Sequence, residues 1–239
     1  MKEIVRSVIE RFFTAMHRIS FIRRLAISFV QLTFWRDRRV RRYLDITEKP
    51  ALQIGCGKNV LSGWLNSDIS LKDSRSGIYM DAGKPFPLPD SSFDYVYSEH
   101  LFEHLTYQQA QNMLKESYRV LKPGGVIRIA TPDLQFLMRL YQEPEKPIHK
   151  DYMAYSVKDS EIPATPVYVI NKFHTSWRHQ IIYDRETLSE ALETVGFKNP
   201  IPCDVGKSQH AVLSGIEGHF KLMPYEFNLL ETMVVEATK

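Results

Sequence analysis

The stretch Ala51-Leu-Gln-Ile-Gly-Cys-Gly57 constrains the fold of this chain more than any other. A short apolar run that ends in G-x-G is typical of a buried strand that turns through glycines toward a ligand. Apolar runs follow at 93–97 and 126–130, and apolar residues at helical spacing lie between them at 110–121. Strands that alternate with helices predict an α/β domain with a mainly parallel sheet.

Composition fits a water-soluble globular domain, with 44% hydrophobic and 25% charged residues. The two cysteines, Cys56 and Cys203, provide no disulfide framework and fit a reducing cytoplasm, where we expect the protein to reside. No apolar run approaches the roughly 18–20 residues that span a bilayer. The N-terminus also lacks the pattern of a secretory signal peptide.

The first 45 residues are basic, with eleven Lys/Arg against four Asp/Glu. Apolar residues recur at helical spacing over 3–19, and a second helical stretch is predicted over 22–34. We therefore expect residues 1–45 to form a basic helical extension and residues 46–239 to form the main domain. Two interpretations of the extension stay open: contact with an anionic inner-membrane surface, or docking on the domain with its arginines in water.

Acidic residues follow the next two predicted strands, Asp68 after 64–67 and Asp81 after 78–80. Acids at the carboxyl ends of parallel strands line the ligand crevice of open α/β sheets. Asp68 stands only 11 residues after Gly57, whereas a dinucleotide site places its acid ~20 residues beyond the glycines. A third glycine, which would admit a pyrophosphate, is also missing. The pattern predicts a site for a nucleoside without phosphates.

These features resemble the class I S-adenosylmethionine-dependent methyltransferases. The resemblance rests on "LQIGCG", "MDAGKPFPLPDSSFDYVYSEHLFEHL", "ESYRVLKPGGVIRIATPD" and "YDRETLSEALETVGF", which occur in the order of that family. It implies a Rossmann-like fold with helices on both faces of a seven-stranded, mainly parallel sheet whose last strand is reversed, and S-adenosylmethionine as methyl donor. The donor site implied by the resemblance comprises Gly55, Cys56, Gly57, Asp68, Asp81, Ala82 and Ser98.

His100, Glu103 and His104 spell H-x-x-E-H, the inverted zinc-peptidase motif. A zinc metallohydrolase is therefore an alternative, which requires these residues on one stable helix. The capping box that begins at Thr106 and the strand that ends near Tyr97 leave little room for such a helix. We expect no metal, and interpret His100 and His104 as candidate bases beside the donor pocket; a packing role for either stays open.

Residues 132–180 contain five prolines and are predicted to be an irregular cap inserted after the fifth strand. Polar and aromatic residues gather near its end, including Asn171, His174 and Trp177. His174 is an alternative base. Basic residues do not alternate with aromatic ones as in a nucleic-acid track, so binding of DNA or RNA is not expected.

The sequence thus predicts O-methylation of a small-molecule or glycan acceptor that carries hydroxyl groups. The segment "GWLN-x-D" resembles a bacterial subgroup associated with glycan and envelope biosynthesis, which favours a sugar of an envelope glycan or its lipid-linked precursor as acceptor. A catalytically inactive scaffold that binds S-adenosylmethionine is a further alternative. The sequence does not predict an oligomeric state.

Overall fold

The computed structural model describes residues 34–70 and 77–239. The chain divides into two compact units, residues 1–46 and 47–239, and each is described by itself. In the first unit residues 34–46 are helical; the helix predicted over 3–19, and all but the last residue of the helix predicted over 22–34, lie outside the described residues. Across the described ranges, no helix combines the length and apolar character needed to cross a membrane.

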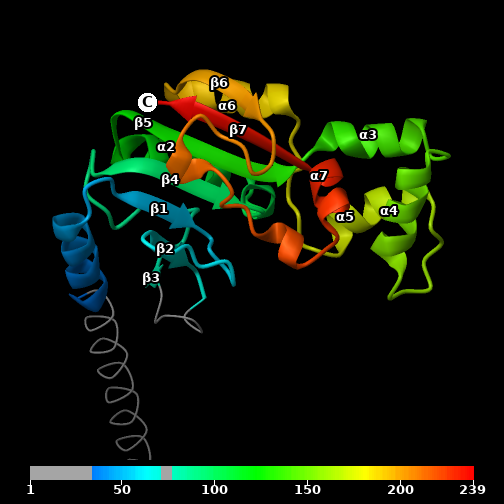
Figure 1. Ribbon diagram of the computed structural model, residues 1–239, viewed down its shortest axis with the longest axis horizontal. Helices are drawn as coiled ribbons and strands as arrows, with labels where there is room; N and C mark the ends of the chain where they lie inside the picture. The colour runs from blue at the N-terminus through cyan, green and yellow to red at the C-terminus, as the bar shows by residue number, and fades with distance from the viewer. Residues whose placement is uncertain (1–33, 71–76) are drawn as a thin grey trace, which may run out of the picture. The chain divides into compact units, whose positions relative to one another are not determined.

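In the described part of the second unit, seven strands form one sheet (Figure 1). They are β1 (Ala51–Ile54), β2 (Leu65–Asp68), β3 (Gly77–Tyr79), β4 (Phe93–Glu99), β5 (Leu121–Pro132), β6 (Lys198–Cys203) and β7 (Thr232–Thr238). Their order is β3-β2-β1-β4-β5-β7-β6. Strands β1 to β5 pair in parallel, and β7 is antiparallel to both β5 and β6. The predicted sheet with a reversed last strand is confirmed.

One face of the sheet packs against α2 (Tyr107–Val120) and α6 (Arg185–Val195), which also contact each other. Helix α2 begins at the predicted capping box, in which the Thr106 side chain accepts from the backbone N–H of Gln109. The opposite face is covered largely by loops and by the short 3-10 helix η3 (Ala211–Leu213). There Tyr97, Ala130, Val205 and Val234 form a buried cluster. All four β1 residues are buried, as expected of a strand covered on both faces.

The insertion is helical rather than irregular, which corrects the expectation for residues 132–180. It contains α3 (Leu134–Gln142), α4 (Pro147–Val157) and α5 (Pro166–Thr175). Pro147 and Pro166 lie in the first turns of their helices, where a missing N–H costs nothing, so prolines that looked like helix breakers instead begin helices.

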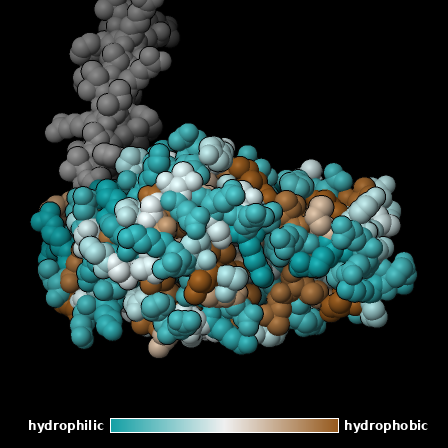
Figure 2. Space-filling view, turned by 90° about the horizontal axis from the view of Figure 1, so that it is seen from above, coloured by the Kyte–Doolittle hydropathy of each residue, from teal (hydrophilic) through white to brown (hydrophobic). Residues whose placement is uncertain are grey.

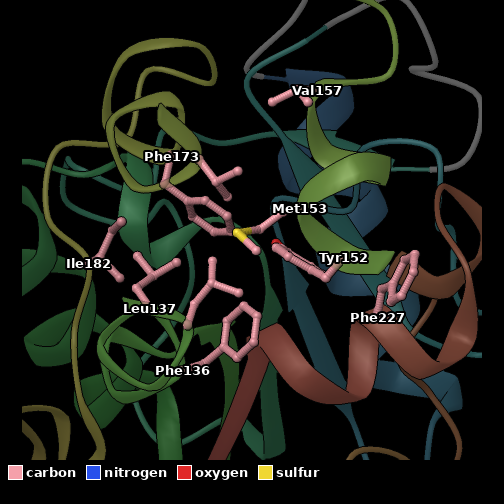
Figure 3. Packing of buried hydrophobic residues seen from close by; sticks show 10 residues of the cluster. Phe136, Leu137, Tyr152, Met153, Val157, Phe173, Ile182 and Phe227 are labelled. Atoms are coloured by element: carbon pink, nitrogen blue, oxygen red, sulfur yellow. The ribbon is translucent and has the colours of Figure 1, made fainter. Parts of the chain in front are cut away.

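These helices and α7 (Tyr225–Glu231) share a hydrophobic core of their own. Figure 3 shows Phe136, Tyr152, Met153, Phe173 and Phe227 converging from the four helices. Toward this end of the domain, the face seen in Figure 2 has apolar patches between its polar residues. The insertion is therefore a packed helical cap whose hydrophobic core includes Phe227 of α7, the helix that leads into β7.

The strand order defines where a ligand can enter. From β1 the chain proceeds outward to β2 and β3 on one side, and then returns to β4 on the other side of β1. Open α/β sheets bind ligands at such a reversal, beyond the carboxyl ends of the strands. The carboxyl ends of β1 and β4 therefore mark the expected site.

Candidate active site

A cavity of about 720 Å³ opens at the carboxyl ends of β1, β4 and β5. One wall is the glycine loop after β1, and a second contains Glu99 and His100 at the end of β4. Helices α4 and α5 of the cap supply further wall residues, and the segment before α7 contributes His219. Sheet, cap and C-terminal segment thus meet around one cavity.

The glycine loop adopts a conformation that other residues rarely take. Gly55 and Gly57 have φ angles of 69° and 48°. A Cβ atom on Gly55 would lie 2.8 Å from a Leu101 methyl carbon, whereas one on Gly57 would meet nothing within 4 Å. The first glycine is needed for packing, and the second keeps space open on the ligand side of the loop.

Asp68, the last residue of β2, is hydrogen-bonded to this loop. Asp68 accepts hydrogen bonds from the backbone N–H of Gly57 at 2.9 Å and of Ser70 at 2.7 Å. Asp81, just after β3, accepts from the N–H of Gly83 and pairs with Lys84 at 3.4 Å. Both carboxylates keep lone pairs for further donors. The order of strands brings both acids to the edge of the sheet that carries the glycine loop.

The predicted donor residues do not all face the cavity. Gly55, Cys56 and Gly57 line it, whereas Asp68, Asp81, Ala82 and Ser98 are outside its lining as the described residues define it. Ala82 is buried, and Ser98 lies inside β4 with a buried hydroxyl that has no hydrogen-bond partner within 34–70 and 77–239. The cavity therefore covers the glycine-loop end of the expected donor site and extends toward the cap.

Glu99 holds two walls of the cavity together. Its carboxylate accepts from the backbone N–H groups of Gly218 and His219 at 2.8 Å each. It also accepts from Nδ2 of Asn59, in the glycine loop, at 3.2 Å. Because these donors come from distant parts of the sequence, Glu99 fixes the position of His219 relative to the loop.

The His100 ring has a neighbour at each of its nitrogen atoms and a second ring stacked on its face. Its φ angle of 45° is unusual for a residue with a side chain. Nδ1 lies 3.3 Å from Oε1 of Glu103, and Nε2 lies 3.1 Å from Oγ1 of Thr232. The ring stacks on His219 with centroids 3.6 Å apart. Burial would lower the pKa of His100, but Glu103 and the nearby Glu231 and Glu99 outweigh it and raise that pKa.

His219 has a carboxylate partner of its own. Its Nε2 lies 3.5 Å from Oε1 of Glu231, whose other oxygen accepts a hydrogen bond from the Tyr152 hydroxyl. Burial and the charge of Glu231 raise the pKa of Tyr152 well above its usual value, so this phenol stays protonated as a donor. Glu231 and Tyr152 thus fix one edge of His219, which is partly exposed to the cavity.

A second group forms around Glu103, which is fully buried. Oε2 accepts from the Thr131 hydroxyl at 2.9 Å, and Oε1 lies 3.9 Å from Nε2 of His104. The rings of His104 and His179 meet edge to face at 4.8 Å. Burial would raise the pKa of Glu103, but contact with His100 lowers it, so the carboxylate stays charged. Burial lowers the pKa of His179.

The zinc-peptidase arrangement is not formed. Only Phe102–His104 is helical in this segment, as the 3-10 helix η2, and His100 precedes it with a positive φ. His100 therefore joins His219 and Glu231, whereas His104 joins Glu103 and His179. Between the end of β4 and the cap of α2 there is no room for the helix that would align both histidines.

His174 lies apart from these groups. It is exposed on α5 and is not among the described residues that line the cavity. His219 and Glu231, which do line the cavity, escaped the sequence analysis. Nothing in the local pattern Glu217-Gly-His-Phe marks His219, because its position depends on long-range contacts with Glu99 and His100.

Comparison with known proteins finds similarity to methyltransferases. Residues 52–129 match the family described as methyltransferase domain. A probable S-adenosylmethionine-dependent methyltransferase from Mycolicibacterium smegmatis is 41% identical over 63 residues, which cover 26% of this chain and 24% of that protein. The chain thus spans about a quarter of the length of this curated relative.

Among solved structures with a similar fold are the following two methyltransferases. One is an S-adenosylmethionine-dependent methyltransferase from Archaeoglobus fulgidus, 19% identical, with a TM-score of 0.47 over 84% of this chain and 92% of that one. The other is phosphoethanolamine N-methyltransferase 2 from Haemonchus contortus, 16% identical, with a TM-score of 0.49 over 81% of this chain and 49% of that one. The fold assignment rests on the strand order and registers described above.

The strand order and the glycine loop are those of the fold of the class I S-adenosylmethionine-dependent methyltransferases, and residues 52–129 match the methyltransferase-domain family. S-adenosylmethionine is the methyl donor of this class. The residues present fit it: Gly57 leaves open space, Asp68 has carboxylate lone pairs for ribose hydroxyls, and the buried Ser98 hydroxyl is unpartnered in the described structure. By these features Gly57, Asp68 and Ser98 would hold the donor.

Proposed function

We propose that this protein transfers a methyl group from S-adenosylmethionine to a hydroxyl group of an acceptor bound in the cavity. The observation that carries the proposal is the placement of His219, with Glu231 behind it, across the same cavity as the glycine loop. S-adenosylmethionine, when bound, supplies an electrophilic methyl group on a sulfonium. The protein's own contribution is to align the acceptor and to remove its proton.

We assign the base to His219 rather than to His100. Both ring nitrogens of His100 already face partners, Glu103 and Thr232, whereas His219 directs one ring edge to Glu231 and stacks against His100. A base flanked by a carboxylate retains a stable imidazolium after it takes a proton. His219 would accept the hydroxyl proton, Glu231 would stabilise the resulting charge, and His100 would hold the ring in position.

The cavity wall favours a sugar-like acceptor. Trp177 presents a partly exposed ring, and Tyr155 lies nearby on α4. Four lysines, Lys58, Lys158, Lys172 and Lys221, are also among the lining residues. Aromatic faces suit sugar rings, and lysines suit acidic or phosphate groups. We therefore propose a hydroxylated sugar, free or within an envelope glycan or its lipid-linked precursor, with an acidic group close by.

Residues 1–45 would bring the enzyme to that substrate. The described helix 34–46 carries arginines at 36, 38, 39, 41 and 42, with Phe34 and Trp35 exposed. Basic and aromatic side chains together favour anionic bilayer surfaces. We propose a cytoplasmic protein that binds the inner membrane surface peripherally. Co-sedimentation with vesicles of anionic lipid tests this, and equal recovery with neutral vesicles would refute it.

Donor binding is tested by calorimetry with S-adenosylhomocysteine. The wild type is expected to bind, and Asp68→Asn is expected to weaken binding by roughly 10–100-fold, because the carboxylate that would accept hydrogen bonds from the ribose hydroxyl groups becomes a neutral amide. Asp204→Asn is the matched control, since that exposed carboxylate pairs with Lys207 and does not line the cavity as the described residues define it. If the wild type binds nothing, or if Asp68→Asn equals the control, the methyltransferase proposal fails.

Transfer itself is tested with radiolabelled S-adenosylmethionine and a panel of free, nucleotide-linked and lipid-linked sugars. With the acceptor so found, His219→Gln is expected to lower kcat by roughly 10²–10⁴-fold and to leave the affinity for S-adenosylhomocysteine unchanged. His174→Gln, which removes an exposed histidine outside the cavity, is expected to have no effect. Donor binding without transfer to any acceptor would support the alternative of an inactive scaffold.

A further inference from the structure

Glu103, His104 and His179 form a cluster on the cap side of the cavity. One ligand atom of each lies within 4.8 Å of the other two, and all three residues line the cavity. They come from two separate segments, η2 after β4 and the stretch that follows α5. Two imidazoles and one carboxylate are a donor set suited to divalent first-row transition metals.

Two buried atoms of this cluster make no hydrogen bond within the described residues. Oε1 of Glu103 and Nδ1 of His179 make no hydrogen bond to any residue in the described ranges. Oε1 is in ion-pair contact with Nδ1 of His100 at 3.3 Å and lies 3.9 Å from Nε2 of His104, whereas Nδ1 of His179 has no such contact in the described structure. Since buried polar atoms are nearly always bonded, the unpartnered Nδ1 of His179, beside a carboxylate oxygen that makes only an ion-pair contact, points to a ligand shared by both.

The neighbouring group of His100, His219 and Glu231 offers the same donor types but is satisfied within the protein. Nε2 of His100 lies 3.1 Å from a threonine hydroxyl, and Glu231 pairs with His219 and accepts from a tyrosine. A metal there would have to displace these contacts. The unsatisfied atoms therefore distinguish the cluster of Glu103, His104 and His179.

We propose that Glu103, His104 and His179 bind a divalent transition-metal ion at the acceptor side of the cavity. Three protein ligands leave coordination positions open toward the cavity, as in sites that bind a substrate oxygen directly. The metal would hold oxygen atoms of the hydroxylated acceptor while His219 takes the proton. Only this acceptor role rests on the proposed function; metal binding does not.

The test is a titration of the metal-free full chain with Co²⁺, followed by visible absorption, with Zn²⁺ as competitor. One ion per chain is expected to give d–d bands that Zn²⁺ abolishes. His104→Gln and His179→Gln are expected to weaken Co²⁺ binding at least about tenfold each. His104 is 36% exposed, so its replacement keeps the proposal testable if a variant at the fully buried Glu103 does not fold.

Two further histidine variants serve as controls. His174→Gln removes an exposed cap histidine outside the cavity, and His219→Gln reports on the other histidine group; both are expected to leave Co²⁺ binding unchanged. The proposal is overturned if the wild type binds no Co²⁺, if His104→Gln and His179→Gln bind as the wild type does, or if His219→Gln alone abolishes binding. Calorimetry with S-adenosylhomocysteine on the same variants separates loss of the metal from loss of the donor site.

Discussion

Arg128 is the residue whose replacement tests the packing of the active-site wall most directly. It lies in β5 with no exposed surface. Its guanidinium binds Glu217 at 2.6 Å and Glu236 at 2.5 Å, and donates to the carbonyl groups of Lys207 and Asp204 at 3.0 and 3.3 Å. Glu217 directly precedes the Gly218–His219 pair that Glu99 holds, so this ion group also anchors the proposed base.

Arg128→Met would leave two carboxylates buried without a cation. Their side chains are only 2% and 3% exposed, so water cannot replace the guanidinium. Breaking a buried ion group by removing one partner typically costs about 3–5 kcal/mol. For a domain of this size each kcal/mol lowers the melting temperature by about 2–4 °C, so a drop of roughly 6–20 °C is expected.

Urea denaturation followed by circular dichroism measures this loss. Lys122→Met is the matched control, because Lys122 lies in the same strand and forms a partly exposed pair with Asp94. That change is expected to cost less than about 1 kcal/mol. Adding Glu217→Gln and Glu236→Gln to Arg128→Met is expected to restore much of the stability, since no unpaired charge then remains buried.

The reasoning is refuted if Arg128→Met costs no more than the Lys122 control. It is also refuted if the triple variant is less stable than Arg128→Met alone. Since the ion group anchors His219, Arg128→Met is further expected to lower methyl transfer more than donor binding. Equal loss of both would show that the damage reaches the glycine loop instead.

Three further predictions follow from local features. Gly57→Ala is expected to lower the free energy of unfolding by about 1–2 kcal/mol, because φ is positive there, and to weaken S-adenosylhomocysteine binding in calorimetry. Gly55→Ala is expected to lower the free energy of unfolding further, because its Cβ would lie 2.8 Å from a leucine methyl carbon. Burial would raise the pKa of Glu116, but hydrogen bonds from Arg119 and a backbone N–H lower it. Glu116→Gln is therefore expected to lower the free energy of unfolding at pH values above the ordinary glutamate pKa of about 4.3. The difference from wild type is expected to vanish as the pH falls through the lowered pKa of Glu116. Phe136→Ala, in the cap core, is expected to cost about 3–5 kcal/mol in urea denaturation, and a change below 1 kcal/mol would show that the cap does not unfold with the sheet.

The sheet and the glycine loop could be predicted because their signals are local. The apolar run before Gly55, the capping box at Thr106 and the apolar stretch of β7 each identify an element within a few residues. The cap helices were missed because Pro147 and Pro166 look like breakers in sequence, although each lies in the first turn of a helix. A proline has opposite meanings at the start and in the middle of a helix, and only packing decides between them.

The histidine groups could not be predicted, because they depend on pairing between distant strands. His100 approaches Glu231 only because β7 runs antiparallel beside β5, which places Thr232 opposite Pro132. His179 reaches Glu103 only because the chain returns from the cap, where the N–H of Gln180 donates to the Glu103 carbonyl at 2.7 Å. Neither approach has a signature in the local sequence.

Backbone strain marks both walls on which these histidines lie. Among the described residues, four side-chain-bearing positions have a positive φ; one of them, His100, lines the cavity, and another, Arg178, lies between the lining residues Trp177 and His179. Such a conformation costs about 1–3 kcal/mol and persists where surrounding contacts impose it. His100 is held by Glu103 and by the ring of His219, and Arg178 directly precedes His179. A glycine at position 100 would remove that cost but would also remove the imidazole, so the strain at His100 fits a site in which that side chain matters more than local stability.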